Sequence, residues 1–187
     1  SLVEPVSSHM AKMLEWKAIA KGVQLILPKD LACGDALPAG SEEVSRMLVP
    51  ADAIPDGGYG LDIGPAASRE IRDALADCRT IIWYGTAGVV ENPQFARGTR
   101  DLAEHLGDLA DRKEALVIVV GGDSVAASSF PPPGAKALHR SDGGRAALEY
   151  LAARTPAAVA ALDECPPDDL ARRRRPGEEL PAALFGR

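Results

Sequence analysis

Apolar and polar residues follow one another along the chain in blocks that predict helices and short buried strands. Residues 4–21 carry apolar side chains at helical spacing, and Gly22 stands where a helix would end. Residues 23–27 (VQLIL) form an almost continuous apolar run that Pro28 closes, which predicts a buried strand. The N-terminal part of the chain is therefore expected to fold as a helix followed by a strand.

The same pattern continues through the rest of the chain. Three more apolar runs predict strands, at residues 80–84, 116–120 and 137–139. Helices are predicted from Pro65 onward and over residues 98–110, 124–128 and 143–154. Residues 29–60 are rich in Gly and Pro and predict one or two short strands with little helix. This alternation predicts an α/β fold, a three-layer Rossmann-like parallel sheet with helices on both faces.

Composition narrows the class of protein. The 187 residues include 46% hydrophobic and 26% charged residues, which is ordinary for a folded domain. The net charge of −6 argues against a nucleic-acid partner, which needs a basic face. Three scattered cysteines fit neither a disulfide framework nor a zinc site, and no apolar run is long enough to cross a membrane. A cytoplasmic protein with reduced thiols and no leader peptide is expected.

A change of composition near the C-terminus indicates a domain boundary. Residues 1–164 are expected to form one domain, and residues 165–187 a peripheral or flexible tail. The tail holds four consecutive arginines at 172–175. Such a run is usually a solvated segment, with contact to an acidic partner as the less favoured alternative.

Three glycine-containing loops follow predicted strands: residues 84–88 (YGTAG), 121–124 (GGDS) and 141–144 (SDGG). Loops after parallel strands lie on one edge of the sheet, where such folds bind ligands. Glycines there let backbone N–H groups approach an anion, and Asp123 is a candidate ligand for a Mg²⁺ that accompanies nucleotide phosphates. Each loop alone fits a purely structural turn, but three on one edge favour a phosphate site. Neither GxxxxGK[ST] nor GxGxxG is present.

Four longer strings of the sequence resemble the phosphoglycerate kinase family. Residues 54–65 (IPDGGYGLDIGP) are similar to the family's IPDGWMGLDIGP, and residues 80–91 (TIIWYGTAGVVE) to TIVWNGPMGVFE. Residues 120–124 (VGGDS) resemble GGGD[ST], and residues 141–149 (SDGGRAALE) resemble STGGGASLE. The strings keep the family's order and spacing over residues 1–164, which identifies the chain as a member of that superfamily.

The resemblance implies an activity and its partners. These kinases transfer a phosphoryl group reversibly between 1,3-bisphosphoglycerate and ADP in glycolysis, with Mg-ADP or Mg-ATP on the C-terminal domain and the acid substrate on the N-terminal one. The chain matches the later part of the C-terminal domain. It is therefore expected to bind nucleotide, to meet 3-phosphoglycerate only through an N-terminal domain, and to be inactive alone. An exposed sheet edge would allow a homo-oligomer.

The resemblance also assigns roles to single residues. Glu91 matches the residue that contacts the ribose, and Tyr84 and Thr86 lie at nucleotide-pocket positions. The phosphate loop corresponds to Gly121, Gly122, Asp123 and Ser124, with Asp123 linked to the metal. Gly143 and Gly144 match the helix start that stabilises the transferring phosphoryl group, which is catalysis by positioning and charge neutralisation.

Several positions depart from the family's pattern: Tyr84 replaces Asn, Thr86 replaces Pro, Val120 replaces Gly, Asp142 replaces Thr, Arg145 replaces Gly and Ala66 replaces Lys. Asp142 brings a negative charge to a phosphate site, and Arg145 either offsets it or is a solvated helix residue. These departures keep two alternatives open. One is a divergent, non-catalytic domain of this type, and the other is a paralogue that phosphorylates another carboxylate.

Overall fold

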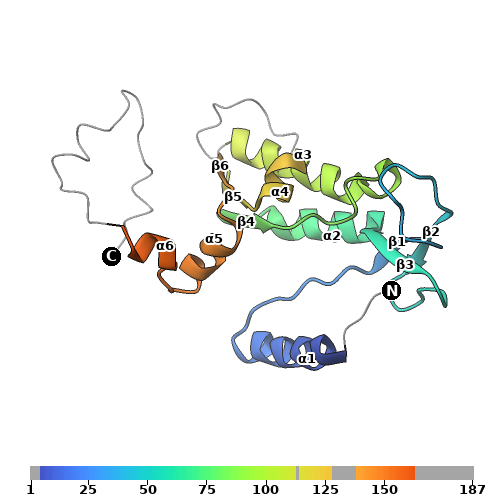
Figure 1. Ribbon diagram of the computed structural model, residues 1–187, viewed down its shortest axis with the longest axis horizontal. Coiled ribbons are helices and arrows are strands. Elements are labelled where there is room, and N and C mark those ends of the chain that lie inside the picture. The colour runs from blue at the N-terminus through green and yellow to red at the C-terminus, as the bar shows by residue number, and fades with distance from the viewer. Residues whose placement is uncertain (1–4, 113, 128–137, 163–187) are drawn as a thin grey trace. The chain divides into compact units, whose positions relative to one another are not determined.

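The computed structural model describes residues 5–112, 114–127 and 138–162 (Figure 1). The chain divides into two compact units, residues 1–147 and residues 148–187. The predicted tail at 165–187 lies outside the described residues. Among the described residues, no helix is long and apolar enough to cross a membrane.

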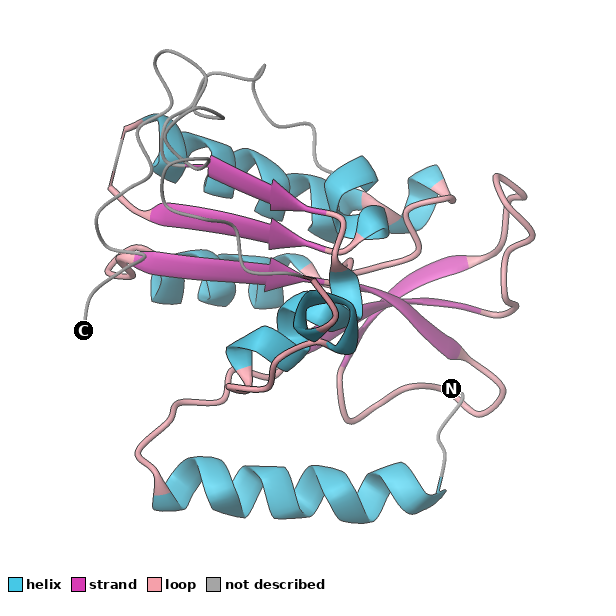
Figure 2. Ribbon diagram, turned by 60° about the vertical axis from the view of Figure 1, so that its left-hand side comes forward, coloured by secondary structure: helices cyan, strands magenta, loops and turns pink. Residues whose placement is uncertain are grey.

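A parallel sheet carries the predicted α/β fold. Its strands β4 (Thr80–Tyr84), β5 (Leu116–Val120) and β6 (Leu138–Ser141) pair in that order and run in one direction (Figure 2). The strands expected at 80–84 and 116–120 have the predicted bounds, and the one expected at 137–139 extends to residue 141. The parallel sheet flanked by helices that the sequence predicts is thereby confirmed.

Helices pack on the sheet through one continuous apolar core. The helices are α2 (Pro65–Leu75), α3 (Arg97–Asp111) and α4 (Gly122–Ala127). The core joins alternate residues of the strands to the apolar stripe of α3, and its largest members are Ile81, Trp83, Leu106, Leu109, Val117 and Val119. The alternate side chains of β4 that do not join this core are exposed to solvent, Ile82 by 42% and Tyr84 by 52%. The period-2 pattern of β4 therefore places one face of this strand in the core and the other in solvent.

A second, antiparallel sheet occupies the region from which only one or two strands were expected. Its strands are β1 (Asp30–Gly34), β2 (Arg46–Pro50) and β3 (Tyr59–Ile63), in the order β2-β1-β3. The pairing of β1 with β3 shifts register between Ala32 and Cys33. A small core of Ala32, Leu61 and Phe95 lies under this sheet, and Phe95 belongs to the 3-10 helix Pro93–Phe95.

The strand predicted at residues 23–27 is wrong. Helix α1 (Pro5–Ala20) ends close to the expected place, and Gly22 has the positive φ of 65° that closes such a helix. The following residues have no regular structure, and Val23, Leu25 and Leu27 are 49–68% exposed. An apolar run becomes a strand only when a neighbouring strand pairs with it, and in this chain pairing starts after Pro28, at Asp30.

Two helices follow β6. Helix α5 (Gly144–Leu151) begins at the predicted glycine pair but ends before Arg154, because Ala153 has a φ of 55° that a helix does not continue. The short helix α6 (Ala157–Ala160) lies in the second unit. The predicted helix at 124–128 appears as α4, which begins two residues earlier.

Candidate functional site

The three glycine loops lie at one edge of the parallel sheet, as predicted. Tyr84 pairs with Val120, and Val120 pairs with Ser141, so the last residues of β4, β5 and β6 are level with one another. Each loop begins at or just after one of these residues. The carboxyl edge of the sheet therefore presents residues 84–88, 121–124 and 141–144 side by side.

Hydrogen bonds join these three loops. The Gly85 N–H donates to the Ser124 hydroxyl at 2.8 Å. The Gly121 N–H donates to the carbonyl oxygen of Ser141 at 2.9 Å, and the Gly143 N–H donates to the Ser141 hydroxyl at 3.2 Å. The second loop is thus tied to both of its neighbours, which fixes the spacing of the backbone along this edge.

Two of the glycines are required by backbone conformation. Gly85 has a φ of 89° and Gly121 a φ of 96°, both in the region that L-residues rarely adopt. The Tyr84 ring lies alongside Gly121, since a Cβ built on that glycine would be 3.6 Å from Tyr84 Cε2. Each strand therefore turns sharply at its end, and an aromatic side chain stands next to the turn of the second loop.

A residue of α3 that the sequence did not single out holds the first loop, residues 84–88, in place. The hydroxyl of Thr99, in the first turn of α3, accepts hydrogen bonds from Ala87 N–H at 3.0 Å and Gly88 N–H at 3.3 Å. Thr99 is 1% exposed. No motif marked this threonine, because its role depends on the packing of α3 against the loop rather than on a local pattern.

The predicted site residues differ in how far solvent reaches them. Asp123, Glu91, Gly122 and Gly143 are exposed, while Thr86, Gly121 and Gly144 are half-buried. Tyr84 is 52% exposed, and Ser124 is 1% exposed. Ser124 accordingly holds the Gly85 backbone from within the core, whereas the Asp123 carboxylate stands at the surface at the start of α4.

The described residues of this edge do not form a complete protein cage for a metal ion. Among the residues that the structure describes, no three His, Cys, Asp or Glu side chains lie close enough to hold a metal ion. Mg²⁺ with a nucleotide commonly takes one or two carboxylates and completes its shell with phosphate oxygens and water. The exposed Asp123 fits that arrangement when a nucleotide supplies the phosphates.

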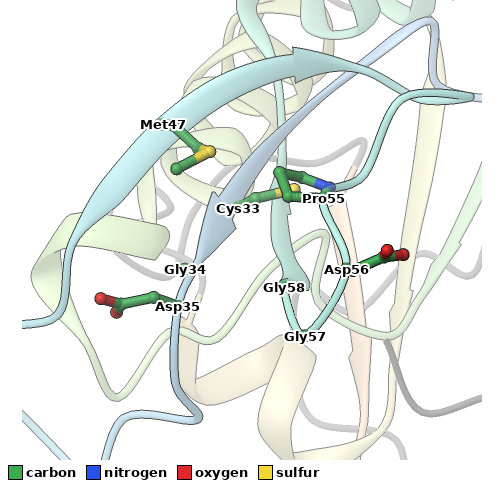
Figure 3. A pocket seen from close by; sticks show the side chains of 8 residues that line it. All are labelled: Cys33, Gly34, Asp35, Met47, Pro55, Asp56, Gly57 and Gly58. Atoms are coloured by element: carbon green, nitrogen blue, oxygen red, sulfur yellow. The ribbon is translucent and has the colours of Figure 1, made fainter.

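The largest hollow that we describe lies apart from these loops. It has a volume of about 320 Å³ and is lined by β1, β2 and the turn at residues 55–58 (Figure 3). Cys33 and Met47, which pair across β1 and β2, line it, and none of its lining residues belongs to the three loops. Burial raises the pKa of the Cys33 thiol, so the sulfur stays protonated and unreactive near neutral pH. Cys33 and Cys78 are free thiols, and Cys165 lies outside the described residues.

A parallel sheet with glycine loops hydrogen-bonded along its carboxyl edge defines an α/β protein of the class that binds ligands at that edge. A family model described as phosphoglycerate kinase matches residues 1–154. The chain belongs to the phosphoglycerate kinase family.

Relatives agree with this placement and show how much of them the chain covers. It is 44% identical over 164 residues to phosphoglycerate kinase of Trichodesmium erythraeum, covering 88% of this chain and 40% of that one. It is 46% identical to the chloroplastic phosphoglycerate kinase of Volvox carteri, covering 35% of that protein. The solved phosphoglycerate kinase of Coxiella burnetii superposes with a TM-score of 0.70 at 34% identity, covering 81% of this chain and 37% of that one. The chain thus spans about two fifths of the length of such relatives.

Proposed function

We propose that this chain is the nucleotide-binding portion of a phosphoglycerate kinase-type phosphotransferase. The reaction is reversible phosphoryl transfer between 1,3-bisphosphoglycerate and ADP. The observation that carries the proposal is the hydrogen-bonded row of three glycine loops at the carboxyl edge of one parallel sheet. Phosphoryl transfer depends mainly on positioning, and the hydrogen bonds of this row fix the three loops in place beside one another.

In this proposal each loop has its own task. The exposed backbone around Gly121 and Gly122 receives the nucleotide phosphates, and Asp123 provides the carboxylate for Mg²⁺. Bound Mg²⁺ would neutralise charge between the phosphates. Thr86 and Tyr84 border the nucleotide, Glu91 reaches the ribose, and Gly143 with Gly144 faces the transferring group from the start of α5.

Ser124 contributes through the backbone rather than by direct contact. Its hydroxyl is buried and accepts the Gly85 N–H. It therefore sets the distance between the first and second loops, on which nucleotide binding depends. This modifies the direct contact that the family resemblance implies for this position.

In this proposal, the acid substrate binds to a part of the protein that lies outside these 187 residues. The relatives are more than twice as long, and 3-phosphoglycerate would meet the nucleotide only when that part is present. We accordingly expect no turnover from the 187-residue chain. Cytoplasmic location, absence of nucleic-acid and membrane partners, and a homo-oligomer through an open sheet edge remain further proposals.

The experiment that tests this function is calorimetric titration of Mg-ADP into the chain, with Asp123→Ala beside it and Asp111→Ala as the control. Asp111 is an exposed carboxylate at the far end of α3. We expect binding to the parent chain and to Asp111→Ala, and at least about 10-fold weaker binding to Asp123→Ala, because a carboxylate–metal link is lost. Equal affinities in all three proteins would contradict the proposed role of Asp123.

A second candidate function rests on two side chains at the same edge. The exposed Tyr84 ring lies alongside Gly121, and the exposed Asp142 puts a negative charge next to the third loop. Both features favour a divergent, non-catalytic domain that has lost nucleotide binding. Absence of Mg-ADP binding by the parent chain, with binding gained in Asp142→Thr, would select this alternative. A paralogue acting on another carboxylate is tested only with the remaining part of the protein.

A further inference from the structure

The hollow on the antiparallel sheet, shown in Figure 3, is formed by two paired strands and a tight turn. Cys33 of β1 and Met47 of β2 line it from paired positions, and Pro55 lines it from the turn at residues 55–58. Its volume of about 320 Å³ is within the roughly 300–1,000 Å³ of small-molecule pockets. The hollow is therefore large enough for a small ligand, and none of its described lining residues belongs to the three glycine loops.

The turn on one side of the hollow has a fixed shape. The Gly58 N–H donates to the carbonyl oxygen of Pro55 at 2.9 Å, which closes the turn. Gly57 has a φ of 78°, a conformation that L-residues rarely adopt. Figure 3 shows the side chain of Cys33 directed toward Pro55. The hollow is therefore formed before any ligand arrives, since its turn and its strands are both held by backbone hydrogen bonds.

Gly58 is the position at which this wall lacks a side chain. It is buried, it lines the hollow, and its φ lies outside the left-handed region, so its backbone admits an L-residue. A Cβ built on Gly58 would be 3.1 Å from the Pro55 carbonyl oxygen and 3.5 Å from Pro55 Cδ. The string IPDGWMGLDIGP, which residues 54–65 resemble, has Trp at this position. Glycine in place of an indole side chain leaves space beside the Pro55 ring.

The chemistry of the lining favours an aromatic group without negative charge. The sulfur atoms of Cys33 and Met47 are polarisable and make favourable contacts with aromatic rings. Asp35 and Asp56 are exposed at opposite sides of the hollow, with their carboxylates turned outward (Figure 3). No Lys, Arg or His is among the described residues that line it. An anionic ligand would meet like charges at the rim, whereas an uncharged ring meets an apolar floor.

We propose that this hollow binds an uncharged planar aromatic molecule of about the size of indole. An apolar cavity of about 150 Å³ holds one benzene ring, so a hollow of about 320 Å³ has room for two fused rings. The ligand lies beside Gly58, between the Pro55 ring and the sulfur atoms of Cys33 and Met47. It covers the Met47 side chain, which is 41% exposed without it. The proposal does not depend on nucleotide binding.

The test is a titration of the 187-residue chain with indole, followed through the backbone amide NMR signals. We expect the signals of Cys33 and Gly57 to shift with saturation, and that of Gly85 in the first glycine loop to stay in place. Gly58→Trp supplies an indole ring from the chain itself, so it should abolish the response. Indole-3-acetate has the same rings and a carboxylate, and it should bind several-fold more weakly than indole because of the charges at the rim.

Met47 and Leu48 provide a matched pair of variants. They are neighbours on β2, 41% and 50% exposed, and Leu48 lines a different hollow because successive side chains of a strand point to opposite faces. Met47→Glu should weaken indole binding by about 10-fold or more, since it places a charge against the ring. Leu48→Glu should leave the affinity unchanged. Both side chains are exposed, so this comparison holds even where Gly58→Trp does not fold.

Four outcomes would each overturn the proposal. They are no saturable shift at Cys33 and Gly57 in the parent chain, equal weakening by Met47→Glu and Leu48→Glu, an undiminished response in folded Gly58→Trp, and equal affinities for indole and indole-3-acetate. Asp123→Ala should bind indole as the parent chain does, because that residue belongs to the glycine loops. Failure of nucleotide binding is thereby distinguished from failure of this site.

Discussion

The hydroxyl of Ser124 accepts the N–H of Gly85 at 2.8 Å, although 39 residues separate them. Ser124 is 1% exposed and lies in α4, while Gly85 follows β4 with a φ of 89°. The bond makes the start of the first loop depend on the second. The candidate phosphate edge is therefore one hydrogen-bonded unit, and a change in one loop is expected to reach the other.

Ser124→Ala tests this dependence. The substitution leaves the Gly85 N–H without its partner, so the free energy of unfolding should fall by about 1–3 kcal/mol. Mg-ADP affinity should fall as well, because the first loop loses its fixed position. Chemical denaturation and calorimetry measure the two effects. Ser41→Ala, at an exposed serine, is the matched control, and an equal loss of stability and affinity there would contradict the role of Ser124 in holding the first loop.

Asp30→Ala should destabilise the start of α2. The carboxylate, which reaches the helix from β1, accepts the N–H groups of Ala66 and Ala67, and no cap from the helix's own residue replaces it. We expect a loss of about 1–2 kcal/mol in the free energy of unfolding, as for other N-terminal caps. Denaturant titration checks this. Asp52→Ala, an exposed aspartate, should change little, and comparable losses in both variants would contradict the capping role.

Asp62 should give the protein an unusual dependence on pH. Burial raises the pKa of this carboxyl above 3.8, and the Gly98 and Ile63 N–H groups oppose that rise only in part. A raised pKa in the folded state means that the folded protein binds the proton more tightly. Its stabilising contribution is complete below 3.8 and is lost as pH rises through the folded-state pKa.

Asp62→Asn provides the measurement for that prediction. The difference in unfolding free energy between the parent chain and this variant should be largest in acid and should shrink as pH rises above 3.8. Near neutral pH the variant should still be destabilised by about 1–3 kcal/mol, since one amide oxygen replaces two carboxylate oxygens that accept N–H groups. A difference that grows with pH would contradict the direction of the shift.

His105 should make the stability of the protein depend on pH in the opposite direction from Asp62. Burial lowers the pKa of its imidazole below 6.5, with the nearby Arg72 charge as a further cause, and its buried Nε2 has no hydrogen-bond partner among the residues that the structure describes. The unfolded chain then binds the proton more readily, so stability is complete above 6.5 and falls as pH decreases below it. His105→Gln should remove that decrease, as measured by thermal unfolding from about pH 8 to about pH 5. His139→Gln, at an exposed histidine, should leave the decrease in place.

Comparison of sequence and structure shows which features a linear pattern can carry. The strands at 80–84 and 116–120 were predictable because each is a compact apolar run whose neighbours along the chain also pack beside it. The position of the three loops at one edge was predictable because the carboxyl ends of parallel strands lie at the same edge of a sheet. The run at 23–27 has the same composition, yet it is exposed and unpaired in the structure. Composition marks a segment that is able to form a strand, whereas pairing depends on a partner elsewhere.

The parts of the site that escaped prediction are contacts over long sequence separations. Thr99 holds Ala87 and Gly88, and Asp30 caps a helix 36 residues away. Each of these side chains is an ordinary polar residue in its local sequence. Their roles appear only when two elements are packed together, because a hydrogen bond of this kind leaves no periodic signal. Prediction from sequence therefore located the edge, and the structure identified the residues that fix its shape.

The substitutions at the loop edge lead to a last prediction, which separates weak from lost nucleotide binding. Asp142 is exposed next to the third loop, and a negative charge a few ångströms from a phosphate would cost about 1 kcal/mol or more. Asp142→Thr should therefore tighten Mg-ADP binding by about 5-fold or more. Tyr84→Asn should add to that gain, because the ring that lies alongside Gly121 is removed. Val120→Gly, in contrast, should destabilise the protein, since the Val120 side chain is 1% exposed and its removal would leave a cavity. Calorimetry on the two exposed substitutions, alone and combined, measures the effect, and unchanged affinity in both would mean that neither side chain limits the site.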